Sequence, residues 1–329
     1  MGFDIVMLIE RAIVQGVPLI FGATGEIITE KSGNLNLGIP GIMYVGGISG
    51  TIGAFFYQRS VETLNPFLGI MIPLLCTLIG STLVALIYSF LTITLKANQN
   101  VTGLALTTFG VGLGNFFGGS LTKLIGENGN IPLTQTSQLY KTSFPFADKL
   151  GVFGDLFFAD SYGFMTYLAV VIAVIAAIIL KRTRVGLNLR AVGENPATAD
   201  AAGINVTRYK YVATCTGGAI AGLGGLFYVI GYTGSWSNDG FGDRGWLAIA
   251  LVIFALWKPM LGLLGSLLFG ALYMITIQAA YVFSGATLEL IKMLPYVATI
   301  LVLVFVSIRK KREHQPPESL GLSYFREDR

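Results

Sequence analysis

The chain has 329 residues, of which 53% are hydrophobic and only 12% are charged, and its mean hydropathy is +0.68. Because a soluble domain carries about twice that share of charged residues, this composition excludes a soluble enzyme and a disordered protein and predicts a polytopic membrane protein. The net charge of +4 comes from clustered basic residues and does not indicate nucleic-acid binding.

Nine windows without a charged residue are candidates for membrane-spanning helices. They cover residues 12–25, 38–58, 66–95, 97–122, 163–180, 211–231, 245–257, 259–283 and 293–308. Since a spanning helix needs about 20 mostly apolar residues, we expect an all-α bundle with nine spans, or ten if one long window divides. The window 66–95 would reach about 45 Å as one straight helix, and Pro73 is its expected kink, whereas 245–257 is short for a span.

Basic residues set the expected orientation. Six Lys and Arg residues lie in the loop 181–210 and four in the run 309–312. Because loops rich in Lys and Arg stay in the cytoplasm, both regions and the C-terminus are expected there. Four windows separate the two regions, and an even number of crossings returns the chain to the same side of the membrane, which agrees with this placement. Counting backward puts 30–37 and 96–98 inside, and 59–65, 123–162 and the N-terminus outside. The chain then consists of a membrane domain, 1–312, and a cytoplasmic tail, 313–329.

The extracellular loop 123–162 is too polar to span a membrane and too long to be a simple turn. One interpretation is an extracellular cap over the translocation path. The other is a solvated connector, and the sequence leaves both open.

Residues that carry catalysis or bind metal are scarce. Cys76 and Cys215 lie in apolar windows, and the single histidine, His314, lies in the tail. Neither a disulfide framework nor a metal site is expected from them. The chain also lacks the Gly-x-x-x-x-Gly-Lys-Ser/Thr phosphate loop, so any ATP must bind to another protein.

The loop 181–210 contains the signals of a short helix. Asn195 is a suitable N-cap for a helix that begins at Pro196, and Gly203 is a suitable C-terminal stop. The residues between them, with Ala199 near the middle, are small. Such a helix buries little on its own, which favours docking into a groove of another protein. An ordinary connector between two membrane helices is the alternative.

Three motifs resemble a known transporter class. The loop sequence GLNLRAVGENPATADAAGINV, residues 186–206, resembles the coupling-helix loop of ABC importer permeases of the ribose and branched-chain amino acid class, as does GGAIAGLGG at 217–225. The segment GEIITEKSGNLNLGI, residues 25–39, is similar to the permeases of bacterial nucleoside importers that work with a basic-membrane-protein lipoprotein, and most of all to the shorter permease of each pair. Pro40 departs from that pattern, in which a Glu is common. The likeness covers most of residues 10–308.

The resemblance implies a type II importer-like permease bundle in the bacterial cell membrane. Its implied partners are a second permease, forming a heterodimer, a cytoplasmic ATP-binding subunit and an extracellular substrate-binding lipoprotein. The ATPase would grip the loop helix around 194–203, which makes Glu194, Asn195, Pro196, Ala199 and Gly203 the expected coupling residues. This chain itself would bind no cofactor and catalyse no reaction, because ATP and Mg belong to the ATPase.

Neutral polar residues within the windows are candidates for the substrate path. They are Asn98 and Asn100 at the inner mouth, Thr108 and Asn115 seven residues apart on one helix, Gln278 in an apolar helix and Trp236 in the outer turn 232–243. A nucleoside is neutral and needs amide, hydroxyl and aromatic partners, which suits these residues, and a sugar would suit them equally. For Trp236, stacking on a base and anchoring at the membrane interface are both open. The glycine-rich run 38–53 is interpreted as a broken helix beside the path.

Charged residues refine this interpretation. Arg244 is expected to pair with Asp243 or Asp239 or to reach the lipid headgroups. The windows hold no ionisable residue at mid-membrane, which speaks against a secondary transporter driven by an ion gradient. Import of a sugar or a branched-chain amino acid by an ABC system stays an alternative.

Overall fold

The computed structural model describes residues 5–125, 130–141, 151–159, 162–280, 282–309 and 315–326. Helices dominate this part of the chain, and its one small sheet pairs two strands, β1 and β2, antiparallel. The elements are α1 Ile5–Glu30, α2 Ile39–Ser60, α3 Pro66–Ser89, η1 Phe90–Thr94, α4 Gln99–Ile125, β1 Asn130–Pro132, α5 Thr134–Tyr140, α6 Val152–Phe157, α7 Phe164–Arg182, α8 Arg184–Glu194, α9 Pro196–Ala201, α10 Val206–Leu226, η3 Phe227–Thr233, β2 Ser235–Ser237, α11 Arg244–Phe254, α12 Pro259–Ala279, α13 Ala286–Lys292 and α14 Leu294–Arg309. η1 and η3 are π-helical continuations of α3 and α10.

The predicted all-α membrane fold is confirmed, and each of the nine windows falls on a helix. Within the described residues, seven helices are long and apolar enough to cross a membrane, or eight if the bent pair α13–α14 counts as one span. This number is below the expected nine to ten. The main reason is α11, whose 11 residues extend only about 16 Å, roughly half of a bilayer's hydrocarbon core.

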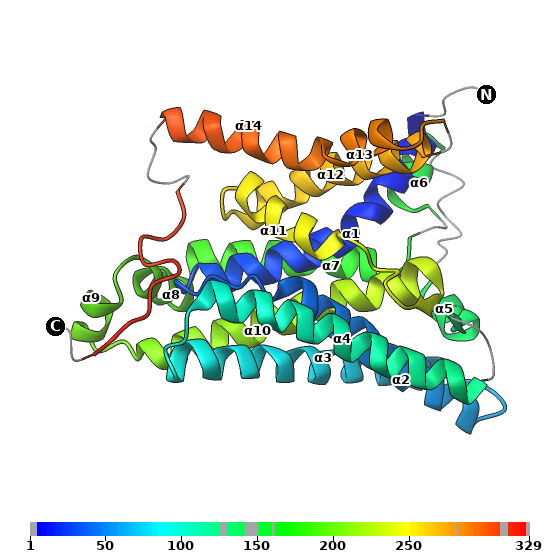
Figure 1. Cartoon of the computed structure of the whole chain (residues 1–329), viewed down its shortest axis with the longest axis horizontal. Coiled ribbons are helices and arrows are strands. Elements are labelled where there is room, and N and C mark those ends of the chain that lie inside the picture. Colours follow the sequence, from blue (N-terminus) through cyan, green and yellow to red (C-terminus); the bar gives the residue numbers. More distant parts are fainter. Residues whose placement is uncertain are drawn as a thin grey trace.

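The long helices lie side by side along the longest axis of the molecule, with α8, α9 and the C-terminal segment at one end and α5, α6 and the start of α1 at the other (Figure 1). We call these the α9 end and the α5 end. At the α9 end, Leu35 N donates to Gln99 Oε1 at 2.7 Å, and Ser319 N donates to Gly193 O at 3.1 Å. The predicted grouping of 30–37, 96–98, 181–210 and the tail on one side is therefore confirmed. Residues 310–312 of the basic run lie outside the described residues.

The described parts of the loop 123–162 fold against the α5 end. β1 pairs with β2, and Leu133 N donates to Gly234 O at 2.9 Å. Tyr140 on α5 is 1% exposed, and its hydroxyl donates to Ile70 O at 2.9 Å. These contacts favour the interpretation of a packed cap over that of a solvated connector.

Close helix packing forms the centre of the bundle. A Cβ placed on Gly46 of α2 would lie 2.5 Å from Gly222 Cα of α10, and a Cβ on Gly25 of α1 would lie 2.2 Å from Gly217 O. Glycine allows these backbones to touch. The expectation of a broken helix over 38–53 is wrong, because α2 is continuous and Ile39 to Gly50 are buried in it with a single exception, Ser49. Its glycines serve contact with α10.

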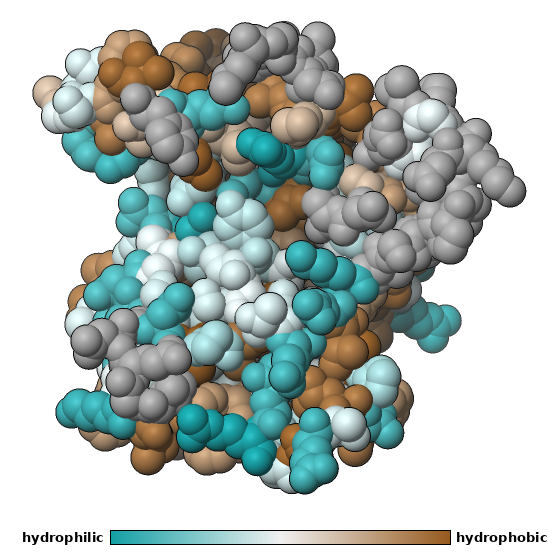
Figure 2. Space-filling view, turned by 90° about the vertical axis from the view of Figure 1, so that its right-hand side faces the viewer, coloured by the Kyte–Doolittle hydropathy of each residue, from teal (hydrophilic) through white to brown (hydrophobic). Residues whose placement is uncertain are grey.

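The outer surface fits a membrane protein. Large apolar side chains are exposed along α3, α4, α7, α12 and α14, for example Leu83, Phe109, Val171, Leu264 and Leu301. Figure 2 looks onto the α5 end, where hydrophilic and intermediate residues occupy much of the middle of the face. In the same view the body narrows on the left below an upper lobe, which Figure 1 identifies as the layer of α12 to α14.

Candidate functional site

The loop between α7 and α10 forms two short helices whose ends are set by local hydrogen bonds. Thr183 Oγ1 accepts from Gly186 N at 3.1 Å at the start of α8, and Asn195 Oδ1 accepts from Thr198 N at 2.9 Å at the start of α9. Gly203 has φ +82°, a left-handed conformation that favours glycine. The sequence-based assignment of a helix capped by Asn195 and stopped at Gly203 therefore agrees with the structure.

The predicted coupling residues do not share one surface. Glu194, Asn195 and Gly203 are exposed, and Pro196 is half-buried. Ala199 is only 3% exposed, because it packs inside the chain against Val192, Val206 and neighbouring side chains. The side of α9 that is open to a partner instead carries Ala197, Thr198, Ala201 and, just past the helix, Ala202.

Lys31 links this loop to the turn after α1. Burial lowers the pKa of the Lys31 ammonium, while the nearby Glu194 carboxylate opposes that shift. A Cβ on Gly193 would lie 2.3 Å from Lys31 O, so the end of α8 sits directly on this turn. The loop is thus held close to α1 by backbone contact.

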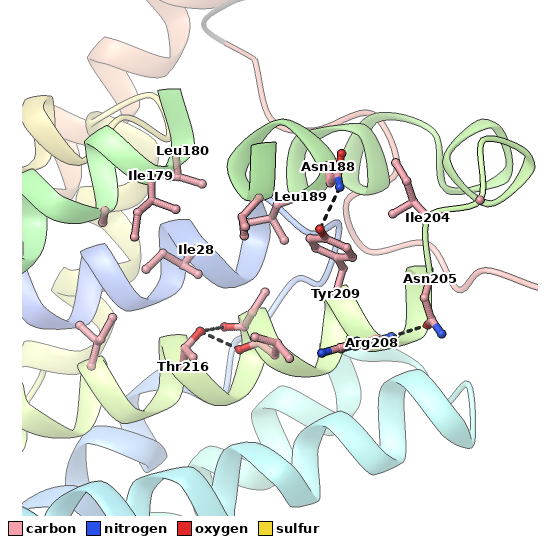
Figure 3. Close-up of a pocket in the computed structure, with 16 residues that line it drawn as sticks. Ile28, Ile179, Leu180, Asn188, Leu189, Ile204, Asn205, Arg208, Tyr209 and Thr216 are labelled. Atoms are coloured by element: carbon pink, nitrogen blue, oxygen red, sulfur yellow. Dashed lines mark hydrogen bonds between the residues drawn. The ribbon is translucent and has the colours of Figure 1, made fainter. Parts of the chain in front are cut away.

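A half-open groove of about 750 Å³ runs beside the loop between α7, α8 and α10. Figure 3 shows Ile28, Ile179 and Leu189 on its apolar walls and Tyr209 reaching across to α8. The Asn188 amide donates to the Tyr209 hydroxyl at 2.9 Å, which ties α8 to α10. The sequence-predicted path residues are not among the residues that line this groove.

A second cluster of polar and aromatic groups lies near the α5 end, where α2, α4 and the turn after β2 meet. Asn115 Nδ2 donates to Asp239 Oδ1 at 2.8 Å, and Asn115 Oδ1 accepts from the Tyr44 hydroxyl. The same hydroxyl accepts from Asp239 N at 2.8 Å. We call Tyr44, Asn115, Trp236 and Asp239 the outer cluster. In it, Asn115 is half-buried and Asp239 is exposed, so both offer polar atoms to a solute.

Trp236 supports the outer cluster from inside. Its ring meets Tyr44 edge-on with centroids 5.0 Å apart, and its Nε1 donates to Asn238 Oδ1 at 3.1 Å. Because the residue is only 2% exposed, the ring is covered. Neither predicted role, stacking on a base or anchoring at the membrane interface, is available to Trp236 in this conformation.

The other predicted path residues are exposed and scattered. Thr108 lies on α4, where its hydroxyl donates to Leu104 O at 3.2 Å, two turns from Asn115. Asn98 and Asn100 lie at the α9 end, and Gln278 lies near the end of α12. Only Asn115 and Trp236 of the predicted set come together, through Tyr44.

Arg244 is more buried than the sequence suggested. It is 6% exposed, and its guanidinium lies over the rings of Tyr228 and Tyr273, at 4.2 and 4.6 Å from their centroids. It donates to Phe241 O at 2.9 Å and to Gln15 Oε1 at 3.4 Å. Since tyrosine faces and amide oxygens surround the cation, the expectation that it snorkels to the headgroups is wrong.

Two buried carboxyl groups lie just beyond the first apolar window, which ends at residue 25, so the sequence analysis did not consider them. Glu26 and Glu30 are one turn apart on α1 and are 1% and 3% exposed. Glu26 Oε1 accepts from Asn36 N at 3.0 Å, and Glu30 Oε2 accepts from the Trp257 indole. Both lie within the last five residues of α1, so they do not contradict the expectation that no ionisable residue lies at mid-membrane. Their spacing of four residues in GEIITE was the available signal.

Comparison with known proteins identifies the class. Residues 8–303 match the family described as branched-chain amino acid transport system, permease component. The chain is 31% identical to the nucleoside ABC transporter permease protein NupC of Lactococcus lactis and 30% identical to the guanosine ABC transporter permease protein NupQ of Bacillus subtilis, each over 90% of this chain and 91% of the relative.

A further relative carries a different name. The putative glucose ABC transporter permease protein TsgC13 of Haloferax volcanii is 31% identical over 97% of this chain and 98% of its own length. No solved structure matches the chain. ATP hydrolysis in such transporters belongs to a separate subunit, so the chain is a permease subunit and not an enzyme. Its fold, its membrane helices and the match over nearly its whole length show that it belongs to the branched-chain amino acid transport system permease family of ABC transporters.

Proposed function

We propose that this chain is a permease subunit of an ABC importer that carries nucleosides across the bacterial cell membrane. The observation that carries the proposal is the likeness to two permeases named for nucleosides and guanosine, at about 30% identity over nine tenths of each chain. The outer cluster supports it, because Asn115 and Asp239 offer the amide and carboxylate groups that bases and ribose hydroxyls bind.

One face of α4 is suited to line the path. Thr108, Gly112 and Asn115 follow each other at spacings of four and three residues, so they lie on one side of the helix. A Cβ on Gly112 would meet nothing within 4 Å, which leaves room beside the helix. We propose that this face forms one wall of the path and that a second permease supplies the opposite wall. A partner of this kind fits the relatives, since NupB of Lactococcus lactis, 24% identical to this chain, is also named as a nucleoside permease.

The α9 end faces the cytoplasm in this proposal, and the α5 end receives the substrate-binding lipoprotein. An ATP-binding subunit, which holds ATP and Mg, docks on the loop around 194–203. Glu194, Asn195 and Gly203 are exposed there, together with the open side of α9. Ala199 supports the loop from within rather than touching the ATPase.

Uptake measurements test the substrate class. The chain is reconstituted in proteoliposomes with its second permease, ATPase and lipoprotein, and uptake of labelled guanosine is measured against unlabelled uridine, glucose and leucine. We expect competition by uridine and none by glucose or leucine. Competition by glucose alone would favour the sugar interpretation, which the relative TsgC13 supports.

A further inference from the structure

The C-terminal segment turns back from α14 and crosses the α9 end to reach α9 (Figure 1, red). We call residues 317–326 the strap. It has no helix or strand, yet Pro317 and Ser319 are buried in it. A chain end that is ordered without regular structure needs side-chain and backbone partners to hold it. The strap has such partners on three separate connections of the bundle.

The strap holds the coupling loop at both ends of α9. Ser319 N and Oγ both donate to Gly193 O, at 3.1 and 2.5 Å, where α8 ends. Further along, the Tyr324 hydroxyl donates to Asp200 Oδ2 at 2.9 Å, and Arg326 Nε lies 3.3 Å from the same oxygen. The Tyr324 ring also packs on the cluster of Val192, Ala199 and Val206.

The same strap holds the inner connections of the membrane helices. Gly321 N donates to Gly33 O at 3.2 Å in the turn between α1 and α2. Gln99 Nε2 donates to Leu322 O at 3.4 Å, and the Lys96 ammonium donates to Tyr324 O and lies 5.4 Å from the Phe325 ring centroid. Lys96 itself has φ +56°, a conformation that costs a lysine about 1 kcal/mol or more and that surrounding contacts must maintain.

Direct packing between α9 and the turn at Lys96 is loose. A surface pocket of about 640 Å³ lies between α9, the start of α10 and the strap, and its lining includes Lys96, Asp200 and Tyr324. Across this space, Tyr324 is the residue that touches both sides. Its hydroxyl binds α9, and its carbonyl binds the residue before α4.

We propose that the strap transmits movement of α9 to the inner ends of α1, α2 and α4, with Tyr324 as the positioning residue at the junction. When an ATPase displaces α9, the strap pulls on Gly33, Lys96 and Gln99 and so couples ATP hydrolysis to opening of the path at this end. This inference rests on the proposed function, because it presumes an ATPase docked at α9.

The decisive variant is Tyr324→Phe, which removes the bond to Asp200 and keeps the ring. In proteoliposomes with the full complex, we expect ATP hydrolysis to persist while solute taken up per ATP falls roughly tenfold or more, the effect of one hydrogen bond to a charged group. Asp200→Ala removes both the acceptor of the Tyr324 hydroxyl and the partner of Arg326, so it should lower the ratio at least as much. Adding Tyr324→Phe to Asp200→Ala should change little further, because the hydroxyl has already lost its acceptor. The matched control is Tyr167→Phe. It removes a tyrosine hydroxyl that donates to Phe157 O at the α5 end, far from the strap, and should leave the amount of solute taken up per ATP unchanged.

A second readout does not depend on the solute. Hydrogen exchange of the Gly321 amide should be slow in the complex both without nucleotide and with bound ATP, because a transmitting strap stays attached while α9 moves. Release of the strap in the ATP-bound state, or an unchanged amount of solute per ATP in both Tyr324→Phe and Asp200→Ala, would overturn the proposal. Absence of nucleoside uptake by the unmodified complex would count against the proposed function alone, since the exchange measurement still tests the strap.

Discussion

Asn115 is the residue at which α2, α4 and the outer turn are joined. Its amide oxygen accepts from Tyr44 and its amide nitrogen donates to Asp239, so both ends of the side chain are engaged in one half-buried place. A solute that enters here would exchange these bonds for its own. Among the predicted path residues, Asn115 has the geometry of a contact residue.

Replacing Asn115 by Leu should therefore reduce uptake. The change leaves the Tyr44 hydroxyl and the Asp239 carboxylate without their partner, at about 1–3 kcal/mol, so we expect a loss of roughly tenfold in uptake rate. Initial rates in proteoliposomes measure it. Thr276→Val on α12, which removes a hydroxyl that donates to Leu272 O of its own helix at 3.1 Å, is the matched control and should behave as the unmodified chain. Equal rates for the two variants would remove Asn115 from the path.

Residue-level predictions succeeded where a rule acts over a few neighbouring positions. The Asn195 cap and the Gly203 stop depend on φ and on bonds within three residues, so the sequence contained them. The environments of Trp236 and Arg244 depend on Tyr44, Gln15 and Tyr273, which are far away along the chain. No local pattern in the sequence specifies such distant partners. The sequence-based predictions therefore put Trp236 and Arg244 at the surface, whereas both side chains are buried.

The same distinction applies to elements. Each of the nine apolar windows falls on a helix, because burial in lipid needs only continuous apolar length. The short window 245–257 already indicated an incomplete span, and α11 has 11 residues there. The window could not show that the turn before α11 contacts α2, where Asp239 N donates to the Tyr44 hydroxyl. For the six-residue helix α9, the composition predicted small residues but not which side the chain itself covers.

The two sides of α9 should respond differently to a large residue. Ala201→Trp adds bulk on the open side, and we expect loss of ATPase binding with normal membrane insertion and stability. Ala199→Trp forces bulk into the packed cluster and should destabilise the chain by about 1–3 kcal/mol, as overpacking does. Thermal unfolding in detergent and co-purification with the ATPase measure the two effects. If Ala201→Trp still co-purified with the ATPase at full yield, the docking side would be wrong.

The contact between α2 and α10 at the centre of the bundle can be tested by adding a single methyl group. A Cβ at Gly46 would lie 2.5 Å from Gly222 Cα, so Gly46→Ala should force α2 and α10 apart and lower the melting temperature. Gly112→Ala on α4 adds the same methyl group where nothing lies within 4 Å and should leave the melting temperature unchanged or slightly raised. Similar melting temperatures for both variants would contradict the contact between α2 and α10.

At the scale of the whole molecule, contacts divide the connections between two ends. The turn after α1, the turn before α4, the loop of α8 and α9 and the strap meet at one end, whereas the connections around β1, β2 and α5 meet at the other. The start of α1 lies beside α6 at the α5 end (Figure 1). The basic loops then favour the α9 end as the cytoplasmic one.

Labelling of single cysteines tests this orientation. In a chain whose Cys76 and Cys215 are replaced, Glu62→Cys should react with a membrane-impermeant maleimide in intact cells, because residue 62 is exposed at the α5 end. Thr198→Cys on α9 should react only after the cells are permeabilised. The reverse pattern would place α9 outside and exclude ATPase docking there.

The central claim is that this chain moves a neutral solute only when a separate ATPase acts on it. Nucleoside uptake into proteoliposomes that contain both permeases and the lipoprotein, with and without the ATP-binding subunit, measures this most directly. We predict accumulation that requires the ATPase and ATP and that disappears when either is omitted. Accumulation of nucleoside without the ATPase, driven by a proton or sodium gradient, would contradict the account.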